Sequence, residues 1–317
     1  MAAPLLEVKE LKKVFMVGPP FNKKKVQAVR NVTFSIYKGE TFGLVGESGC
    51  GKSTTGRMVI RLIEPTGGTV IFSGMDVTKA NARELRRLRR NMQMIFQDPY
   101  ASLNPRMTIG SILTEPYKLH NLYTPKVREA RATALMEEVG LPASYRNRYP
   151  HELSGGQRQR IGIARALALN PHLIVADEPV SALDVSVQAQ LLNLMMDLQD
   201  KYKLSYLFIS HDLRVVKHIC HRIGVMYMGE IVEIGDKEAL YSNPLHPYTQ
   251  ALLSSIPTVE EERRERIVLS GDIPNPANPP CGCAFHPRCP KKMDVCKTVK
   301  PVPQRIGGQT VVCHLYN

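Results

Sequence analysis

The feature that most constrains this chain is the stretch Gly46-Glu-Ser-Gly-Cys-Gly-Lys-Ser53, which fits the pattern Gly-x4-Gly-Lys-Ser. A short apolar run at residues 41–45 precedes it and predicts a strand, and a helical pattern follows it as far as residue 62. Glycines let the main chain wrap closely around phosphate groups and turn its N–H groups toward them. The start of a helix adds the positive end of its dipole. A strand, a glycine-rich loop and a helix in this order predict a phosphate-binding loop.

The residue types of this loop suit a nucleoside triphosphate with its magnesium ion. We expect the Lys52 ammonium to reach the β and γ phosphates and the Ser53 hydroxyl to bind Mg²⁺. The residues of the loop that we expect to bind nucleotide are Gly46, Ser48, Gly49, Cys50, Gly51, Lys52, Ser53 and Thr54.

A second element is the apolar run Leu173-Ile-Val-Ala, which ends in the two carboxylates Asp177 and Glu178. The run predicts a buried strand, and its carboxyl end places both acids beside a phosphate loop. There Asp177 can orient Mg²⁺, and Glu178 can polarise the attacking water as a general base.

A third element, Leu153-Ser-Gly-Gly-Gln157, opens a predicted helix. Its start makes a second anion site, because a serine can cap the helix and the glycines expose main-chain amides. The residues expected to act there are Ser154, Gly155, Gly156 and Gln157. Two phosphate-binding loops in one chain either fold onto one nucleotide or serve different copies of the protein.

Composition narrows the class of protein. Of 317 residues, 43% are hydrophobic, which excludes a disordered chain. No stretch approaches the ~18 consecutive apolar residues of a membrane span, and the first residues lack the pattern of a secretory signal. The net charge is +13, which ATP and an anionic membrane surface account for. Aromatic residues make up 6% and tryptophan is absent, so stacking platforms for nucleic acid are not evident and no nucleic-acid partner is expected.

Taken together, these motifs resemble the ATPase of an ATP-binding-cassette (ABC) transporter over about residues 5–240. The matching segments are Gly46–Thr54, Gln97, Leu153–Gln157, Leu173–Glu178, Ser181–Asp184 and His211, in this order. The resemblance implies a nucleotide-sandwich dimer in which the second loop of one subunit closes on the ATP held by the other. Of the two alternatives for the phosphate-binding loops, the resemblance therefore favours the second, in which each loop serves a different copy of the protein.

The resemblance also implies roles for residues that carry no signal alone. Gln97 links the Mg²⁺ and water site to the transmembrane subunit and is a Mg²⁺ ligand with Ser53 and Asp177. His211 holds the γ-phosphate and the catalytic water, Asp184 lies at the dimer seam, and the adenine stacks on Phe15. Because Glu178, His211 and the second loop are intact, we expect hydrolysis of ATP and not binding alone.

The expected fold is an α/β P-loop NTPase (RecA-like) core with a parallel sheet and an antiparallel β subdomain. A helical signature subdomain is inserted in it, and a small Cys-rich C-terminal extension follows. We expect the ATPase domain over residues 1–255, with the core at 1–97 and 160–255 and the helical subdomain at 98–159. The extension is expected over residues 256–317.

Three further segments, residues 98–106, 149–154 and 243–249, resemble the oligopeptide/dipeptide importer subfamily. This implies two separate transmembrane permease subunits, a second and non-identical ABC ATPase, and an external peptide-binding protein. The chain is then a peripheral protein at the cytoplasmic face of the cell membrane. The same subfamily handles nickel and glutathione, which are alternative cargoes. A soluble ABC ATPase that acts on nucleic acid or ribosomes is the alternative class, weakened because such proteins carry two cassettes per chain.

Five of the seven cysteines fall in the last 37 residues, and such clustering in a cytosolic chain favours a metal over disulfides. Thiolates ligate iron–sulfur clusters and Zn²⁺ alike, so the residues alone leave cluster, zinc and free thiols open. The tail resembles that of the peptide-importer ATPases, in which four cysteines hold a [4Fe–4S] cluster. Cys283, Cys289, Cys296 and Cys313 match that pattern; Cys281 is extra and, with His286, is a reserve ligand for zinc.

Overall fold

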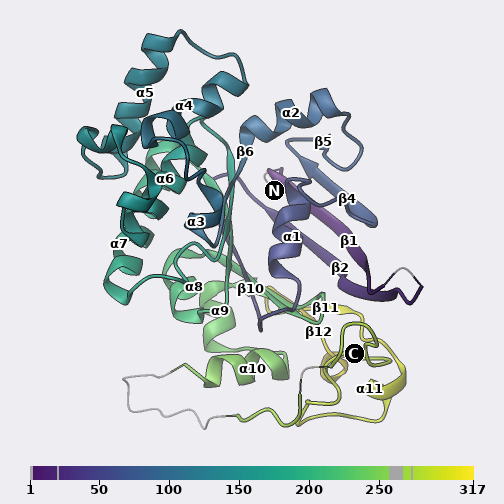
Figure 1. The fold of residues 1–317 in the computed structure, drawn as a ribbon. Helices are drawn as coiled ribbons and strands as arrows, with labels where there is room; N and C mark the ends of the chain where they lie inside the picture. The colour runs from purple at the N-terminus through teal and green to yellow at the C-terminus, as the bar shows by residue number, and fades with distance from the viewer. Residues whose placement is uncertain (1–2, 20, 257–266, 273) are drawn as a thin grey trace. The chain divides into compact units, whose positions relative to one another are not determined.

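The computed structural model describes residues 3–19, 21–256, 267–272 and 274–317. Residues 257–266 and 273 belong to the C-terminal extension expected from the sequence and lie outside the described residues. The chain divides into two compact units (Figure 1). Unit 1 consists of Met1–Lys79 and Ile209–Asn317, and unit 2 of Ala80–Phe208.

Unit 1 contains most of the strands. These are β1 (Leu6–Val17), β2 (Lys24–Ile36), β3 (Thr41–Val45), β4 (Gly67–Phe72), β5 (Met75–Asp76), β9 (Arg222–Tyr227), β10 (Glu230–Asp236), β11 (Pro303–Ile306) and β12 (Gln309–Val312). Its helices are α1 (Lys52–Val59), α8 (Leu213–Ile219), α9 (Lys237–Ser242), α10 (Pro247–Ser254), α11 (Val295–Thr298) and the 3-10 helix η3 (His314–Tyr316). Strand β8 (Ser205–Ser210) runs across the boundary between the units.

The strands of unit 1 follow the order β5-β4-β1-β2-β10-β9-β3. Strand β1 pairs antiparallel with β2 and β4, whereas β3 pairs parallel with β9. All five residues of β3 are buried, as its apolar run predicts for a central parallel strand. The combination of antiparallel and parallel pairings agrees with the predicted α/β class with an antiparallel part.

The end of the chain joins the sheet of unit 1. Strand β12 pairs antiparallel with β10, with Val311 opposite Glu233, and β11 pairs with β12. Val311 is fully buried and packs with Leu245 and Cys313. The few apolar runs of this tail indicate no hydrophobic core of its own, and in the structure it shares the core of unit 1.

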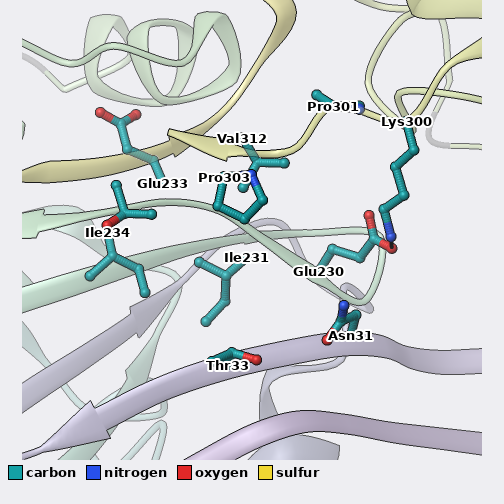
Figure 2. A pocket seen from close by; sticks show the side chains of 11 residues that line it. Asn31, Thr33, Glu230, Ile231, Glu233, Ile234, Lys300, Pro301, Pro303 and Val312 are labelled. Atoms are coloured by element: carbon teal, nitrogen blue, oxygen red, sulfur yellow. Dashed lines mark hydrogen bonds and ion pairs between the residues drawn. The ribbon is translucent and has the colours of Figure 1, made fainter. Parts of the chain in front are cut away.

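A small cavity of about 200 Å³ lies where the tail meets β2 and β10 (Figure 2). Its polar wall includes Asn31, Thr33 and the ion pair between Lys300 Nζ and Glu230 Oε1, at 2.6 Å. None of the residues expected to bind nucleotide lines this cavity.

Unit 2 is mainly helical (Figure 1). Its helices are α2 (Ala82–Asn91), α3 (Pro99–Ser102), α4 (Ile109–Leu119), α5 (Pro125–Glu138), α6 (Gly155–Leu167), α7 (Val185–Tyr202) and the 3-10 helices η1 (Ala143–Asn147) and η2 (Pro150–Glu152). Strands β6 (Met92–Ile95) and β7 (Leu173–Asp177) pair in parallel, and β8 lies beside β7. Every residue of β7 and β8 is buried.

Local sequence signals set several helix ends. Helix α5 begins after Thr124 with Pro125 at its first position, and Gly140 follows its end, as the sequence predicts. Helix α1 is shorter than its apolar pattern, ending at Val59 because Arg61 adopts a left-handed conformation with φ of 54°. None of the helices in the described ranges is long and apolar enough to span a bilayer.

The hairpin of β9 and β10 turns one residue earlier than the sequence suggests. The sequence pattern predicts Gly229-Glu230 as the two-residue turn. In the structure Glu230 pairs with Tyr227, so the two turn residues are Met228 and Gly229. Both turn residues have positive φ, 47° and 78°, which is the requirement of a type I′ turn. The glycine therefore occupies the second central position.

Candidate nucleotide-binding site

The loop between β3 and α1 is closed by its own lysine. Lys52 is only 4% exposed, and its Nζ donates hydrogen bonds to the carbonyl oxygens of Gly46, at 2.8 Å, and Glu47, at 3.0 Å. The ammonium thus lies within the turn of the loop, at the first residue of α1. A buried cation at a helix start is suited to bind the negative charge of a polyphosphate.

The first glycine of the loop permits a close approach to the sheet. Gly46 has φ of 151°, and a Cβ built on it would lie 2.1 Å from the carbonyl oxygen of Met226 in β9. Any side chain would push the loop away from the strand. The glycine that the motif demands is therefore needed here for packing as well as for its conformation.

The other expected loop residues differ in exposure. Ser48 and Gly49 are exposed, whereas Gly51, Ser53 and Thr54 are half-buried. Cys50 is 7% exposed, and burial raises the pKa of its thiol despite the nearby Lys52. Cys50 is thus a packed residue of the loop, with its Sγ 3.8 Å from Lys52 Nζ.

One contact of the loop was not predicted from the sequence. The Arg288 guanidinium donates to both oxygens of the Glu47 carboxylate, from Nη1 to Oε2 at 2.8 Å and from Nη2 to Oε1 at 3.0 Å. The two residues are 241 positions apart. No local pattern marks either of them, so only the fold could reveal the pair.

In unit 2, two of the expected residues meet at the carboxyl ends of adjacent strands. Asp177 is the last residue of β7 and is fully buried, and Glu178 follows it with φ of 46°. The Gln97 amide donates from Nε2 to Oε2 of Glu178 at 3.0 Å. The parallel register explains the contact, because Ile95 and Ala176 are paired and each predicted residue lies two positions beyond its paired strand residue.

The second loop forms a capping box at the start of α6. Ser154 Oγ accepts from the main-chain N–H of Gln157, at 3.3 Å, and Gln157 Oε1 accepts from that of Ser154, at 3.0 Å. A Cβ on Gly156 would lie 2.7 Å from Val187 Cγ1 in α7. A side chain at Gly156 would therefore collide with α7, so close packing of the two helices requires glycine at this position.

The remaining residues expected at the site are Phe15, His211 and Asp184. Phe15 is half-buried in β1, with Lys13 Nζ 5.0 Å from its ring centroid, and His211 is exposed just after β8. Asp184 is the exposed N-cap residue of α7. Phe15, His211 and the phosphate loop belong to unit 1, whereas Gln97, Asp177, Glu178, Asp184 and the second loop belong to unit 2.

Three cysteines of the tail, Cys283, Cys289 and Cys313, have raised pKa values. Burial raises the pKa of Cys283 to about 11, and the neighbouring Cys296 and Cys313 add to the rise. Burial also raises the pKa of Cys289 and Cys313, with further contributions from neighbouring cysteines. Cys281 is exposed. Across the described ranges, no three or more His, Cys, Asp or Glu side chains are arranged as a site for a metal ion.

Comparison with known proteins identifies the family of this chain. Residues 29–181 match the family model described as ABC transporter, and residues 232–296 match the model described as the C-terminal region of oligopeptide/dipeptide transporters. A solved structure of the ATP-binding cassette MJ0796, dimeric and bound to ADP and Pi, is similar with a TM-score of 0.66 at 29% identity. The match covers 73% of this chain and 98% of the MJ0796 chain.

Curated relatives match along almost the whole chain. The oligopeptide transport ATP-binding protein AppF of Bacillus subtilis is 55% identical over 99% of this chain and 98% of its own length. The putative oligopeptide transport ATP-binding protein YkfD of the same organism is 57% identical over 99% and 96%. A probable peptide ABC transporter ATP-binding protein of Sinorhizobium fredii is 51% identical over 99% and 91%. With its P-loop NTPase-type α/β fold, the chain therefore belongs to the ABC transporter ATP-binding proteins that carry the oligopeptide/dipeptide C-terminal region.

Proposed function

We propose that this chain hydrolyses ATP to power the import of peptides through separate membrane-spanning subunits. The observation that carries the proposal is the phosphate loop, in which the nearly buried Lys52 closes the turn at the start of α1. The C-terminal match over residues 232–296 and the peptide-transport relatives support peptide as the cargo.

In this proposal the loop binds the triphosphate and Lys52 neutralises the β and γ phosphates. Ser53, Gln97 and Asp177 would hold Mg²⁺, which would supply positive charge to balance the charge that develops on the phosphate groups. Glu178 accepts a proton from the attacking water, and His211 orients that water and the γ-phosphate. The hydrogen bond from Gln97 to Glu178 supports this role, because it fixes the direction of the carboxylate.

The ATPase acts as a pair of subunits in this proposal. The second loop, Ser154–Gln157, closes on the nucleotide of the other subunit, with Asp184 at the seam and the adenine on Phe15. The similar MJ0796 cassette is dimeric, which supports the arrangement. The partners are two permeases, a second and non-identical ATPase and an external peptide-binding protein, and the complex places this chain peripherally at the cytoplasmic membrane face.

We also propose the domain organisation that the sequence suggests. Residues 1–255 form the ATPase domain, with the inserted helical part at 98–159, and residues 256–317 form the extension. Cys283, Cys289, Cys296 and Cys313 hold a [4Fe–4S] cluster, with zinc as the alternative. Their thiol chemistry supports a shared site, as does the contribution of neighbouring cysteines to the raised pKa of Cys283, Cys289 and Cys313. The role of this site is to stabilise the extension.

The test is transport by the assembled complex. The chain is copurified with its permeases and sealed in vesicles, and uptake of a labelled oligopeptide is measured with ATP or a non-hydrolysable analogue on the side of this chain. Uptake that requires hydrolysable ATP supports the proposal. Uptake of nickel or glutathione but not of peptide would change the proposed cargo and leave the proposed ATPase role in place. Uptake that does not depend on ATP refutes the proposal.

A further inference from the structure

Glu47, the second residue of the phosphate loop, has partners on all of its polar groups. Its main-chain N–H donates to Tyr248 Oη at 3.0 Å, and its carbonyl accepts from Lys52 Nζ at 3.0 Å. Its carboxylate accepts two hydrogen bonds from Arg288. The conformation of the loop at this position is therefore set jointly by α1, α10 and the C-terminal extension.

The contact with Arg288 differs from an ordinary surface ion pair. Arg288 is 9% exposed, and its guanidinium meets the carboxylate side by side, with two N–H groups on two oxygens. Such bidentate, charge-assisted bonds fix the relative geometry of both groups and are stronger than bonds between neutral partners. The pair therefore holds the Glu47 side chain in one direction.

The support of Arg288 is rigid because an aromatic residue anchors it. Phe285 is 1% exposed, and its ring centroid lies 5.2 Å from that of Tyr227 and 5.4 Å from that of Tyr248. The main-chain N–H of Arg288 donates to the carbonyl of Phe285 at 3.0 Å. The turn that carries Arg288 is thus fastened to the same tyrosine that holds the main chain of Glu47.

The charges explain why such a contact matters for nucleotide binding. A carboxylate in a loop that receives a triphosphate would repel it, since like charges in a partly buried site are poorly screened. The Arg288 cation cancels that charge and draws the carboxylate toward the extension.

We propose that Arg288 is a positioning residue for the phosphate loop, which neutralises and orients Glu47 and thereby makes ATP affinity depend on the C-terminal extension. The inference rests on the proposed function, in which this loop binds ATP. It assigns to the extension an effect on the ATPase site that no motif of the loop contains.

The test compares charge states of the pair in the full chain. We measure the Kd of a fluorescent ATP analogue, and the KM and kcat of ATP hydrolysis, for Arg288→Gln, Glu47→Gln and the double variant. Arg288→Gln is expected to raise Kd and KM about tenfold and leave kcat at saturating ATP unchanged. The double variant, with the charge again balanced, returns to within about twofold of wild type. Arg305→Gln removes the same charge from an exposed position of the extension and is expected to change nothing.

Two results would overturn the inference: unchanged ATP affinity in Arg288→Gln, or a double variant as weak as Arg288→Gln. If Arg288→Gln fails to fold, Arg288→Lys keeps the cation and must bind ATP more weakly than wild type but fold normally. Failure of the inference is separable from failure of the proposed function through Lys52→Ala. If Lys52→Ala loses ATP binding but Arg288→Gln keeps wild-type affinity, the inference alone is refuted. A wild-type chain that binds no ATP refutes both the inference and the proposed function.

Discussion

The Gln97 side chain donates a hydrogen bond of 3.0 Å from Nε2 to Oε2 of Glu178. Each residue follows a buried strand, and the parallel pairing of β6 with β7 brings them to the same edge. The bond joins a neutral amide to the carboxylate that we propose as the general base. Gln97 therefore orients the Glu178 carboxylate, and its neutral amide does not compete for the proton that Glu178 must accept.

Substitution of that carboxylate separates binding from hydrolysis. In Glu178→Gln the amide can still accept a hydrogen bond but cannot take a proton from water, so we expect kcat to fall about 10²- to 10⁴-fold. ATP affinity stays at the wild-type level, and the chain accumulates as an ATP-bound dimer. Phosphate release, nucleotide binding and size-exclusion chromatography measure these three effects.

The matched control for this variant is Glu137→Gln, an exposed carboxylate of α5 in the same unit. It should hydrolyse ATP like wild type. Near wild-type turnover in Glu178→Gln would exclude Glu178 as the base.

The lysine of the loop is expected to be needed for binding itself. Lys52→Ala removes the cation for the phosphates and also the donor that ties the carbonyls of Gly46 and Glu47 together. We expect ATP affinity to fall by about 100-fold, the scale of losing one partner of a buried charged contact. Equilibrium binding of a fluorescent ATP analogue measures it, with the exposed Lys126→Ala as control. Equal affinity in the two variants would contradict the phosphate-loop assignment.

Sequence reasoning reached the parts of the site that rest on local order. The Gly-x4-Gly-Lys-Ser loop, the cap of α6 at Ser154 and the ends of α5 follow from residues that are neighbours in the chain. The meeting of Gln97 with Glu178 was accessible through the family resemblance, which implies Gln97 at the Mg²⁺ and water site, where Glu178 is expected to polarise the attacking water.

Long-range relationships were not accessible in this way. The pairing of β12 with β10 and the contact of Arg288 with Glu47 join residues far apart in the sequence, and many partners are equally compatible with either pattern. The apolar positions of the tail are scattered, so its sequence alone does not indicate which of them join a core. Phe285 and Val311 nevertheless pack against the rest of unit 1, since a few apolar residues suffice when the other side of the core comes from the remainder of the unit.

The cysteines of the tail give a prediction with an internal control. If Cys283, Cys289, Cys296 and Cys313 share a [4Fe–4S] cluster, the chain purified without oxygen is coloured and contains about four irons. Cys289→Ser should lose most of that iron, because a thiolate ligand is replaced by a hydroxyl. Cys281→Ser, which alters the exposed cysteine outside the four, should keep it.

Metal analysis of the same samples decides between the alternatives. One zinc per chain without colour would support the zinc site in place of the cluster. A chain with neither metal would contradict a metal site in the tail.

His246 is a buried histidine whose ionisation is coupled to folding. It is 1% exposed, its Nδ1 accepts from the main-chain N–H of Tyr248 at 3.0 Å, and burial lowers its pKa to about 3. Its own main-chain N–H donates to the carboxylate of Glu233, a group whose pKa is raised by burial. The ring thus caps α10 in the neutral state.

We expect this histidine to destabilise the protein in acid. The unfolded chain gains a proton on His246 below about pH 6.5, whereas the folded chain does so only near pH 3, so stability is lost as the pH falls between these values. The slope is about 1.4 kcal/mol per pH unit, or about 2 kcal/mol between pH 6.5 and 5. His246→Asn keeps a side-chain acceptor at the N-cap but cannot titrate. Urea unfolding of both proteins at pH 7.5 and pH 5 measures the effect, and the titration of Glu233 cancels because both proteins retain it. The free energy of unfolding of wild type should drop by about 2 kcal/mol more than that of His246→Asn, and an equal drop in both would show that the folded protein accepts the proton on this ring.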